Sequence, residues 1–196
     1  MSKTSSKTKL NLLRSYPKNI FCLEALWNRN IENKLTVLPI LELVAKTRGI
    51  KFIYLTSNTL SEFEFNLKLL SRKRTYQILY FAFHGDSDLI ELGDSAISLK
   101  ELEGMLAGRF KDLVVHFGSC GTMNVDLGKL NEFTKNAGVR MVSGYTKEVD
   151  WIESSAMDML YFSKLQDYRS ISHLDAFLRK TYPDLVEHTG FTTFRI

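Results

Sequence analysis

The chain has 196 residues, a length typical of one domain, and it is 44% hydrophobic and 24% charged, the balance of a soluble globular protein. Its formal charge of +4 lies mostly in the first 18 residues. It has no apolar run long enough to span a bilayer, no secretory signal and too few cysteines for a disulfide framework. We therefore expect a cytoplasmic protein with a disordered basic tail over residues 1–18 and a single domain over residues 19–196.

Short apolar runs alternate with amphipathic stretches along the chain, which predicts strands and helices in turn. The expected strands cover residues 19–26, 50–55, 77–83, 112–117, 139–145 and, at the end of the chain, 185–196. The expected helices cover residues 35–49, 59–74, 98–108, 126–138, 150–168 and 172–182. Residues 89–99 have the pattern of a small hairpin around Gly93, Asp94 and Ser95.

Local signals mark the ends of several of these helices. Thr59 with Glu62, and Ser98 with Glu101, have the spacing of a capping box, and Gly138 is a typical helix stop. Short buried strands that alternate with amphipathic helices are typical of a parallel sheet covered on both faces. We therefore expect an α/β fold, a three-layer sandwich in which helices flank a mainly parallel sheet.

Two of the expected strands end on reactive side chains. "YFAFHG" leads into His84 and Gly85, and "VVHFGSC" leads into Cys120. In sheets of this kind ligands bind beyond the carboxyl ends of the strands, and consecutive strands are often neighbours. Each residue alone has an ordinary structural explanation, but their joint placement favours a Cys–His dyad at one edge of the sheet.

The residues around the dyad suit acyl-transfer chemistry. An imidazole can hold a thiol as the nucleophilic thiolate and can later protonate a leaving amine. The backbone amides of Gly85 and Cys120 are candidate donors to the oxyanion that forms. The small residues Gly118, Ser119 and Gly121 leave room for a substrate backbone near the thiol.

At these residues the chain resembles the caspase–haemoglobinase fold of cysteine peptidases, above all its CHAT branch, which includes separase-like and CRISPR-linked members. The resemblance covers roughly residues 19–168 and includes the later segment "VRMVSGYTKEVDWIESSAMDMLYFSKL". It implies a caspase-like sheet, His84 as base, Cys120 as nucleophile and an oxyanion site that includes Gly85. The function expected from it is cysteine endopeptidase activity on a protein or peptide, without a cofactor.

The resemblance also suggests which residues form the substrate pocket. Asp150 lies where related proteins shape the first specificity pocket, so it is a candidate partner for a basic substrate residue, although it could equally cap the following helix. Trp151 and Asp86 are further candidates. CHAT domains often carry repeat or sensor modules, and none is recognisable here. Activation by a partner protein, activation by self-association and the absence of any activation step therefore stay open.

Two other functions fit parts of the sequence. An α/β-hydrolase or amidotransferase has its nucleophile in a G-x-C-x-G elbow, and the second glycine of that elbow is missing in Gly118-Ser119-Cys120-Gly121-Thr122. An enzyme of this kind would need His173 or His188 as its base. A non-catalytic caspase-like interaction module is the alternative outside enzymes.

The sequence predicts no metal site, no nucleic-acid site and no membrane site. His116 fits a packed strand residue and Cys22 a core residue, and no group of residues has metal-ligand spacing. The positive charge forms a tail rather than a patch among aromatics, so no specific nucleic-acid partner is expected. Because no apolar run is long enough to span a bilayer, no membrane partner is expected either.

Overall fold

The computed structural model describes residues 16–28, 30, 32, 34–93, 95–168 and 171–196. The main sheet consists of β1 (Asn19–Glu24), β2 (Phe52–Thr56), β3 (Tyr76–Ala82), β7 (Val114–Phe117), β8 (Met141–Tyr145) and β9 (Phe191–Phe194). A smaller sheet consists of β4 (His84–Asp86), β5 (Leu89–Leu92) and β6 (Ser95–Ser98). The helices are α1 (Leu38–Arg48), α2 (Leu60–Leu70), α3 (Leu99–Leu106), α4 (Leu127–Ala137), α5 (Trp151–Leu165), α6 (Ile171–Thr181) and α7 (Pro183–Thr189).

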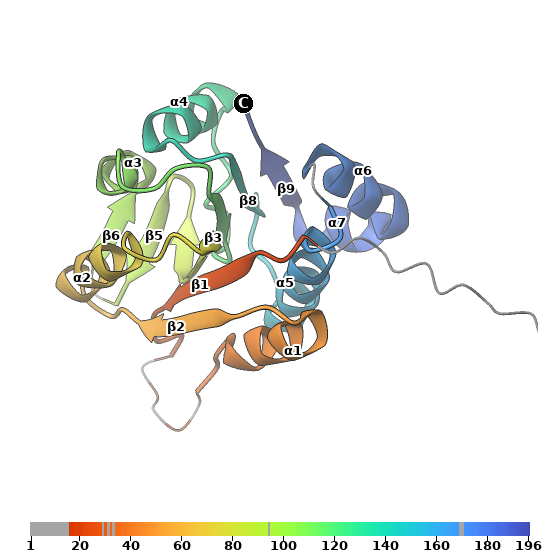
Figure 1. Ribbon diagram of the computed structural model, residues 1–196, viewed down its shortest axis with the longest axis horizontal. Coiled ribbons are helices and arrows are strands. Elements are labelled where there is room, and N and C mark those ends of the chain that lie inside the picture. Colours follow the sequence, from red (N-terminus) through yellow and green to blue (C-terminus); the bar gives the residue numbers. More distant parts are fainter. Residues whose placement is uncertain (1–15, 29, 31, 33, 94, 169–170) are drawn as a thin grey trace, which may run out of the picture.

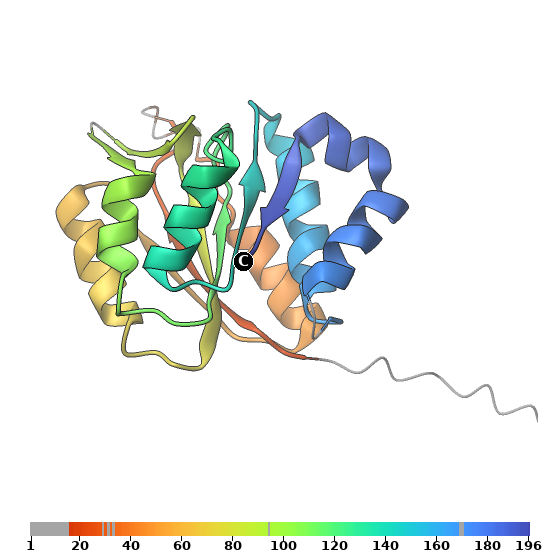
Figure 2. The same cartoon turned by 90° about the horizontal axis from the view of Figure 1, so that it is seen from above.

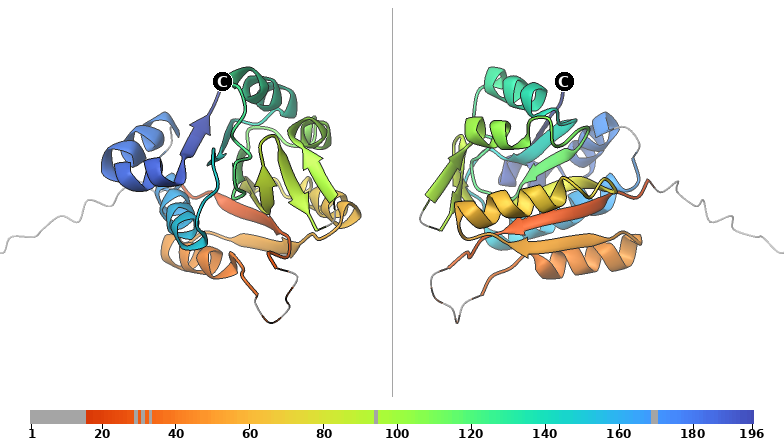
Figure 3. Two further views of the ribbon diagram at one scale, coloured as in Figure 1. Left: turned by 180° about the vertical axis from the view of Figure 1, so that it is seen from behind. Right: turned by 60° about the vertical axis from the view of Figure 1, so that its left-hand side comes forward.

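The main sheet has the order β2-β1-β3-β7-β8-β9, and all its neighbours are parallel except β8 and β9. Helices α2, α3 and α4 cover one face, and α1, α5, α6 and α7 lie on the other (Figures 1 and 2). The expected three-layer sandwich with a mainly parallel sheet is confirmed. The small sheet lies at the end of the main sheet toward which the arrows of β1 and β2 point (Figure 3).

Alternating side chains of the central strands fill two separate cores, one on each face of the sheet. In β1, Phe21 and Leu23 join the first core, whereas Ile20 and Cys22 join the second. Successive strand residues point to opposite faces, so a strand covered on both sides must be apolar throughout. This is the pattern from which the strands were predicted.

The predicted helix ends are also present. Thr59 and Ser98 each form a complete capping box with the glutamate three residues later. Gly138 takes the left-handed conformation, with φ of 71°, directly after α4. Most elements are a few residues shorter than predicted because the predicted ranges include cap and turn residues at their ends.

The structure differs from the sequence prediction at two places. Residues 183–189 form helix α7, and only residues 191–194 form the terminal strand, because Pro183 favours the start of a helix and Gly190, with φ of 62°, ends it. His84 and Gly85 belong to a short strand, β4, that pairs with β5 in the predicted hairpin. Asp94, within the predicted turn, lies outside the described residues.

The chain is already anchored before residue 19. The Tyr16 amide donates to the Gln166 carbonyl at 2.7 Å, and Lys18 Nζ donates to the carbonyls of Tyr16, Leu165 and Tyr168. The predicted tail over residues 1–18 otherwise lies outside the described residues. In the part of the chain that the structure describes, no helix combines the length and apolar character needed to cross a bilayer.

Candidate active site

The ends of two neighbouring parallel strands bring His84 and Cys120 to one pocket. Phe81 of β3 pairs with Phe117 of β7. His84 comes three residues after Phe81, and Cys120 comes three residues after Phe117. Both residues line a pocket of about 350 Å³, together with Gly85, Asp86, Glu91, Gly121 and Glu148. His84 is exposed and Cys120 is half-buried, so solvent and a substrate can reach both.

A backbone carbonyl orients the His84 imidazole. His84 Nε2 lies 2.8 Å from the carbonyl oxygen of Trp27, and the Trp27 ring packs edge-on against the imidazole with centroids 5.1 Å apart. A carbonyl oxygen only accepts hydrogen bonds, so Nε2 carries a hydrogen in this contact. In the neutral ring, Nδ1 is then the nitrogen that can accept a proton.

The buried carboxylate of Glu24 holds Trp27 in place. Glu24 ends β1 and is 2% exposed. It accepts four hydrogen bonds: from Trp27 Nε1 at 2.6 Å, the Val37 amide at 2.8 Å, Thr36 Oγ1 at 2.7 Å and the Tyr54 hydroxyl. Burial and the hydrogen bond to Glu24 raise the pKa of Tyr54 to about 12, so its hydroxyl stays a donor. The chain of contacts from Glu24 through Trp27 therefore reaches His84.

Backbone hydrogen bonds tie the Cys120 loop to the ends of β3 and β8. The Gly118 amide donates to the Phe81 carbonyl at 2.8 Å, and the Gly121 amide donates to the Lys147 carbonyl at 3.1 Å. Cys120 Sγ lies 4.0 Å from the Val149 carbonyl oxygen. Among the described residues no acceptor pairs with the Cys120 amide, which leaves that N–H available to a ligand.

Gly85 lies where β4 packs most tightly against the cysteine loop. A Cβ at this position would be 2.5 Å from Thr122 Oγ1, 2.8 Å from Ser119 Cβ and 2.9 Å from the Leu89 carbonyl oxygen. Thr122 Oγ1 itself donates to that carbonyl at 2.9 Å and lies 2.6 Å from Ser119 Oγ. No side chain fits at residue 85 unless the histidine strand and the cysteine loop move apart.

We expect Gly85→Ala to lower the free energy of unfolding by about 1–3 kcal/mol, the usual effect of overpacking. It should also slow thiol labelling of Cys120 in the folded protein, because the added methyl group displaces the loop. Denaturant unfolding and alkylation kinetics measure the two effects.

The matched control is Gly104→Ala, at an exposed helical position where a Cβ meets nothing within 4 Å. This change should stabilise the protein by about 0.5–1 kcal/mol through helix propensity. Equal behaviour of the two variants would contradict the tight-packing explanation.

The pocket is acidic. Asp86, Glu91 and Glu148 line it, and no lysine or arginine among the described residues does. Glu91 lies beside His84 because the two residues are paired across β4 and β5. Sequence reasoning identified Asp86 but missed Glu91 and Glu148. The pairing of β4 with β5 would have indicated Glu91, and Glu148 lies in the same loop as Asp150.

The other two predicted pocket residues lie beside this pocket rather than in its lining. Asp150 Oδ1 accepts from the amides of Ile152 at 2.8 Å and Glu153 at 3.2 Å, so Asp150 is the N-cap of α5. Trp151 packs edge-on against Trp27, with ring centroids 4.8 Å apart. It is therefore linked to His84 through one intervening ring.

The remaining cysteine and the buried histidine have structural surroundings. Cys22 is fully buried, and burial raises the pKa of its thiol. His116 is also fully buried and bonds to Ser143 and Asp158, as expected for a packed strand residue. Within the described residues, no group of three or more His, Cys, Asp or Glu side chains could hold a metal ion.

A family model described as "Family of unknown function (DUF6642)" matches residues 17–195. No curated protein matches the chain.

Many solved structures are similar in fold, and two caspase structures are among them. Caspase-1 from Spodoptera frugiperda matches with a TM-score of 0.55 and 12% identity, over 93% of this chain and 88% of that one. A structure of pro-sf-caspase-1 matches with a TM-score of 0.58 and 12% identity, over 94% and 93% of the two chains. At this identity the similarity concerns the fold, and the predicted caspase-like architecture is confirmed.

Proposed function

Because the chain belongs to the DUF6642 family, whose function is unknown, its activity has to be inferred from its fold and site, and we propose that it is a cysteine peptidase of the CHAT kind. Cys120 is the nucleophile and His84 the general base. The observation that carries the proposal is that both side chains line one pocket at the carboxyl ends of β3 and β7, in a caspase-like fold. Ligands bind at this edge in parallel α/β sheets.

The contacts of His84 suit the role of a base. With Nε2 bonded to the Trp27 carbonyl, Nδ1 accepts the Cys120 thiol proton, and the thiolate attacks the carbonyl carbon of the scissile peptide bond. The amides of Gly85 and Cys120 donate to the oxyanion. The imidazolium then returns the proton to the leaving amine as the C–N bond breaks, and water hydrolyses the resulting thioester to free the thiolate.

The charge of the pocket suits a basic substrate residue. Asp86, Glu91 and Glu148 provide three carboxyl groups around the proposed dyad. A lysine or arginine next to the scissile bond would gain charge-assisted hydrogen bonds that an acidic residue would not. These three residues, rather than Asp150, are therefore the proposed partners of a basic substrate residue.

One observation favours a second function, that of a latent peptidase or a non-catalytic interaction module. Cys120 Sγ faces the Val149 carbonyl, and no hydrogen bond joins it to His84 in the described part of the chain. Catalytic hydrogen bonds often form only when substrate binds, so in a latent peptidase the Cys120–His84 pair would form after activation, and in an interaction module it would never form.

Peptide cleavage and thiol labelling together test the proposal. We expect the purified chain to cleave library peptides after lysine or arginine, and Cys120→Ala to abolish cleavage. A thiol-directed alkylating probe should label Cys120 far faster than Cys22, which serves as the internal control because burial raises its pKa.

The two measurements separate the outcomes. Fast labelling of Cys120 without cleavage would identify a latent peptidase that needs a protein partner or self-association. Labelling at the rate of an ordinary exposed thiol, unaffected by His84→Ala, together with absent cleavage, would contradict the enzyme and favour the interaction module.

A further inference from the structure

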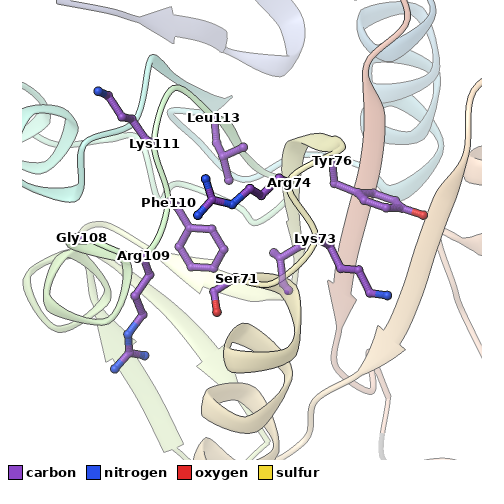
Figure 4. Close-up of a pocket in the computed structure, with 10 residues that line it drawn as sticks. Ser71, Lys73, Arg74, Tyr76, Gly108, Arg109, Phe110, Lys111 and Leu113 are labelled. Atoms are coloured by element: carbon purple, nitrogen blue, oxygen red, sulfur yellow. The ribbon is translucent and has the colours of Figure 1, made fainter.

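A second pocket lies at the opposite end of the main sheet, below the amino ends of β3 and β7. It has a volume of about 330 Å³ and is formed by the turn between α2 and β3 and the loop between α3 and β7 (Figure 4). Its lining consists of Leu70, Ser71, Lys73, Arg74, Tyr76, Gly108, Arg109, Phe110, Lys111 and Leu113. No residue of the candidate active site belongs to it.

The pocket concentrates positive charge. Lys73, Arg74, Arg109 and Lys111 line it, and no acidic residue in the described part of the chain does. The first 15 residues hold four of the 26 lysines and arginines and no acid, so 22 positive residues balance 22 acidic ones in the remainder. The concentration therefore arises from placement within a neutral body, and the expectation that basic charge forms only a tail was wrong.

The four cationic side chains are available to a ligand. All four residues are exposed, and none of them forms an ion pair with another described residue. Arg74 reaches across the pocket between Phe110 and Leu113, whereas Lys73, Arg109 and Lys111 extend outward from its rim (Figure 4). Long side chains on a rim can turn onto a bound anion, and the arginine fork matches two phosphate oxygens at once.

Positive charge continues along the neighbouring edge of the sheet. The Arg140 amide donates to the Leu113 carbonyl at 2.7 Å, which places Arg140 beside the pocket lining. Burial, followed by the charge of Arg140, lowers the pKa of nearby Lys18 to about 8. An anion at this edge would therefore meet a field wider than the pocket itself.

We propose that this pocket binds a small anion that carries two or more phosphate groups. Its volume lies within the usual range for small-molecule sites. Four cations that form no ion pair with another described residue surround one cavity, which is more charge than a single carboxylate would neutralise. A di- or triphosphate supplies matching charge and many acceptor oxygens. The buried ring of Phe110 provides an apolar wall, so the phosphates can come from an inorganic chain or from a nucleotide.

Calorimetric titration of the full chain tests this site, with inorganic triphosphate in one arm and adenosine triphosphate in the other, both without divalent cations. We expect saturable binding in at least one arm at 150 mM salt. Arg74→Gln/Lys111→Gln should weaken that binding at least tenfold. The control Lys46→Gln/Lys180→Gln removes the same charge at exposed positions on α1 and α6 and should change it less than twofold.

The arms also identify the source of the phosphates. Binding of both probes with equal affinity assigns the site to the phosphate chain, and tighter binding of the nucleotide assigns part of the affinity to the apolar wall. Both outcomes support the site. The absence of binding in both arms, or equal weakening by the pocket and control variants at unchanged Tm, would overturn it. Binding at this pocket does not involve Cys120, so the titration result does not depend on whether the chain is a peptidase.

Discussion

His84→Ala is expected to lower kcat/KM for peptide cleavage by about 10²–10⁴-fold, the usual contribution of a positioned acid–base group. In the proposed mechanism this imidazole takes the thiol proton and returns it to the leaving amine, so its loss affects both steps. His84 is exposed, and among the described residues its ring makes one hydrogen bond, to the Trp27 carbonyl, and an edge contact with the Trp27 ring, so the variant should fold normally. The measurement is steady-state cleavage of a lysine- or arginine-containing peptide, with Tm as the check on folding.

His188→Ala is the matched control for this experiment. His188 is 69% exposed, lies 3.1 Å from Glu153 and does not line the Cys120 pocket. Its removal should leave kcat/KM within twofold of the starting value. The reverse pattern, with His84→Ala active and His188→Ala inactive, would contradict the proposed dyad and favour the hydrolase-like alternative in which a later histidine is the base.

Asp158→Ala is expected to lower the free energy of unfolding by about 3–5 kcal/mol, the range measured when one partner of a buried charged network is removed. The Asp158 carboxylate is 3% exposed. It accepts from Tyr80 Oη at 2.6 Å, from His116 Nε2 at 2.8 Å and from the Tyr145 hydroxyl. Through these contacts α5 is joined to β3, β7 and β8. Alanine would leave the buried Tyr80 and His116 donors without this acceptor, whereas the Tyr145 hydroxyl could still donate to the Ser154 carbonyl at 3.0 Å.

The pKa values of the two tyrosines agree with this arrangement. Burial, followed by the charge of Asp158, raises the pKa of Tyr80 and of Tyr145 well above its usual value, so both hydroxyls remain donors. Urea unfolding at neutral pH measures the loss. The control Glu187→Ala, an exposed carboxylate on α7, should change stability by less than about 0.5 kcal/mol. A loss below about 1 kcal/mol for Asp158→Ala would show that the network contributes little.

The local structure of this chain could largely be predicted from its sequence. The capping boxes at Thr59 and Ser98 depend on residues three positions apart, and the αL stop at Gly138 depends on one residue. The prediction failed at Pro183, where the apolar run was assigned to a strand although the proline starts a helix. Short runs of this kind have no clear period, so the turn residues at their ends decide between helix and strand.

The joint placement of His84 and Cys120 could also be predicted, because two parallel neighbouring strands carry whatever follows them to the same edge. Their roles in catalysis stay a prediction. The acidic lining was only partly predicted, since Glu91 comes beside His84 through the pairing of β4 with β5, which the sequence did not indicate.

The sequence by itself determined, through short-range signals, where helices end and how strands and helices alternate. It also determined which strand each of the two reactive residues follows. Only the tertiary structure decided the contacts between distant residues. These include the support of Trp27 by Glu24, the Asp158 network and the basic pocket that joins two turns about 35 residues apart. The physical reason is range, because caps and periodicity act over a few residues, whereas a buried carboxylate or a charged cavity exists only after packing brings its partners together.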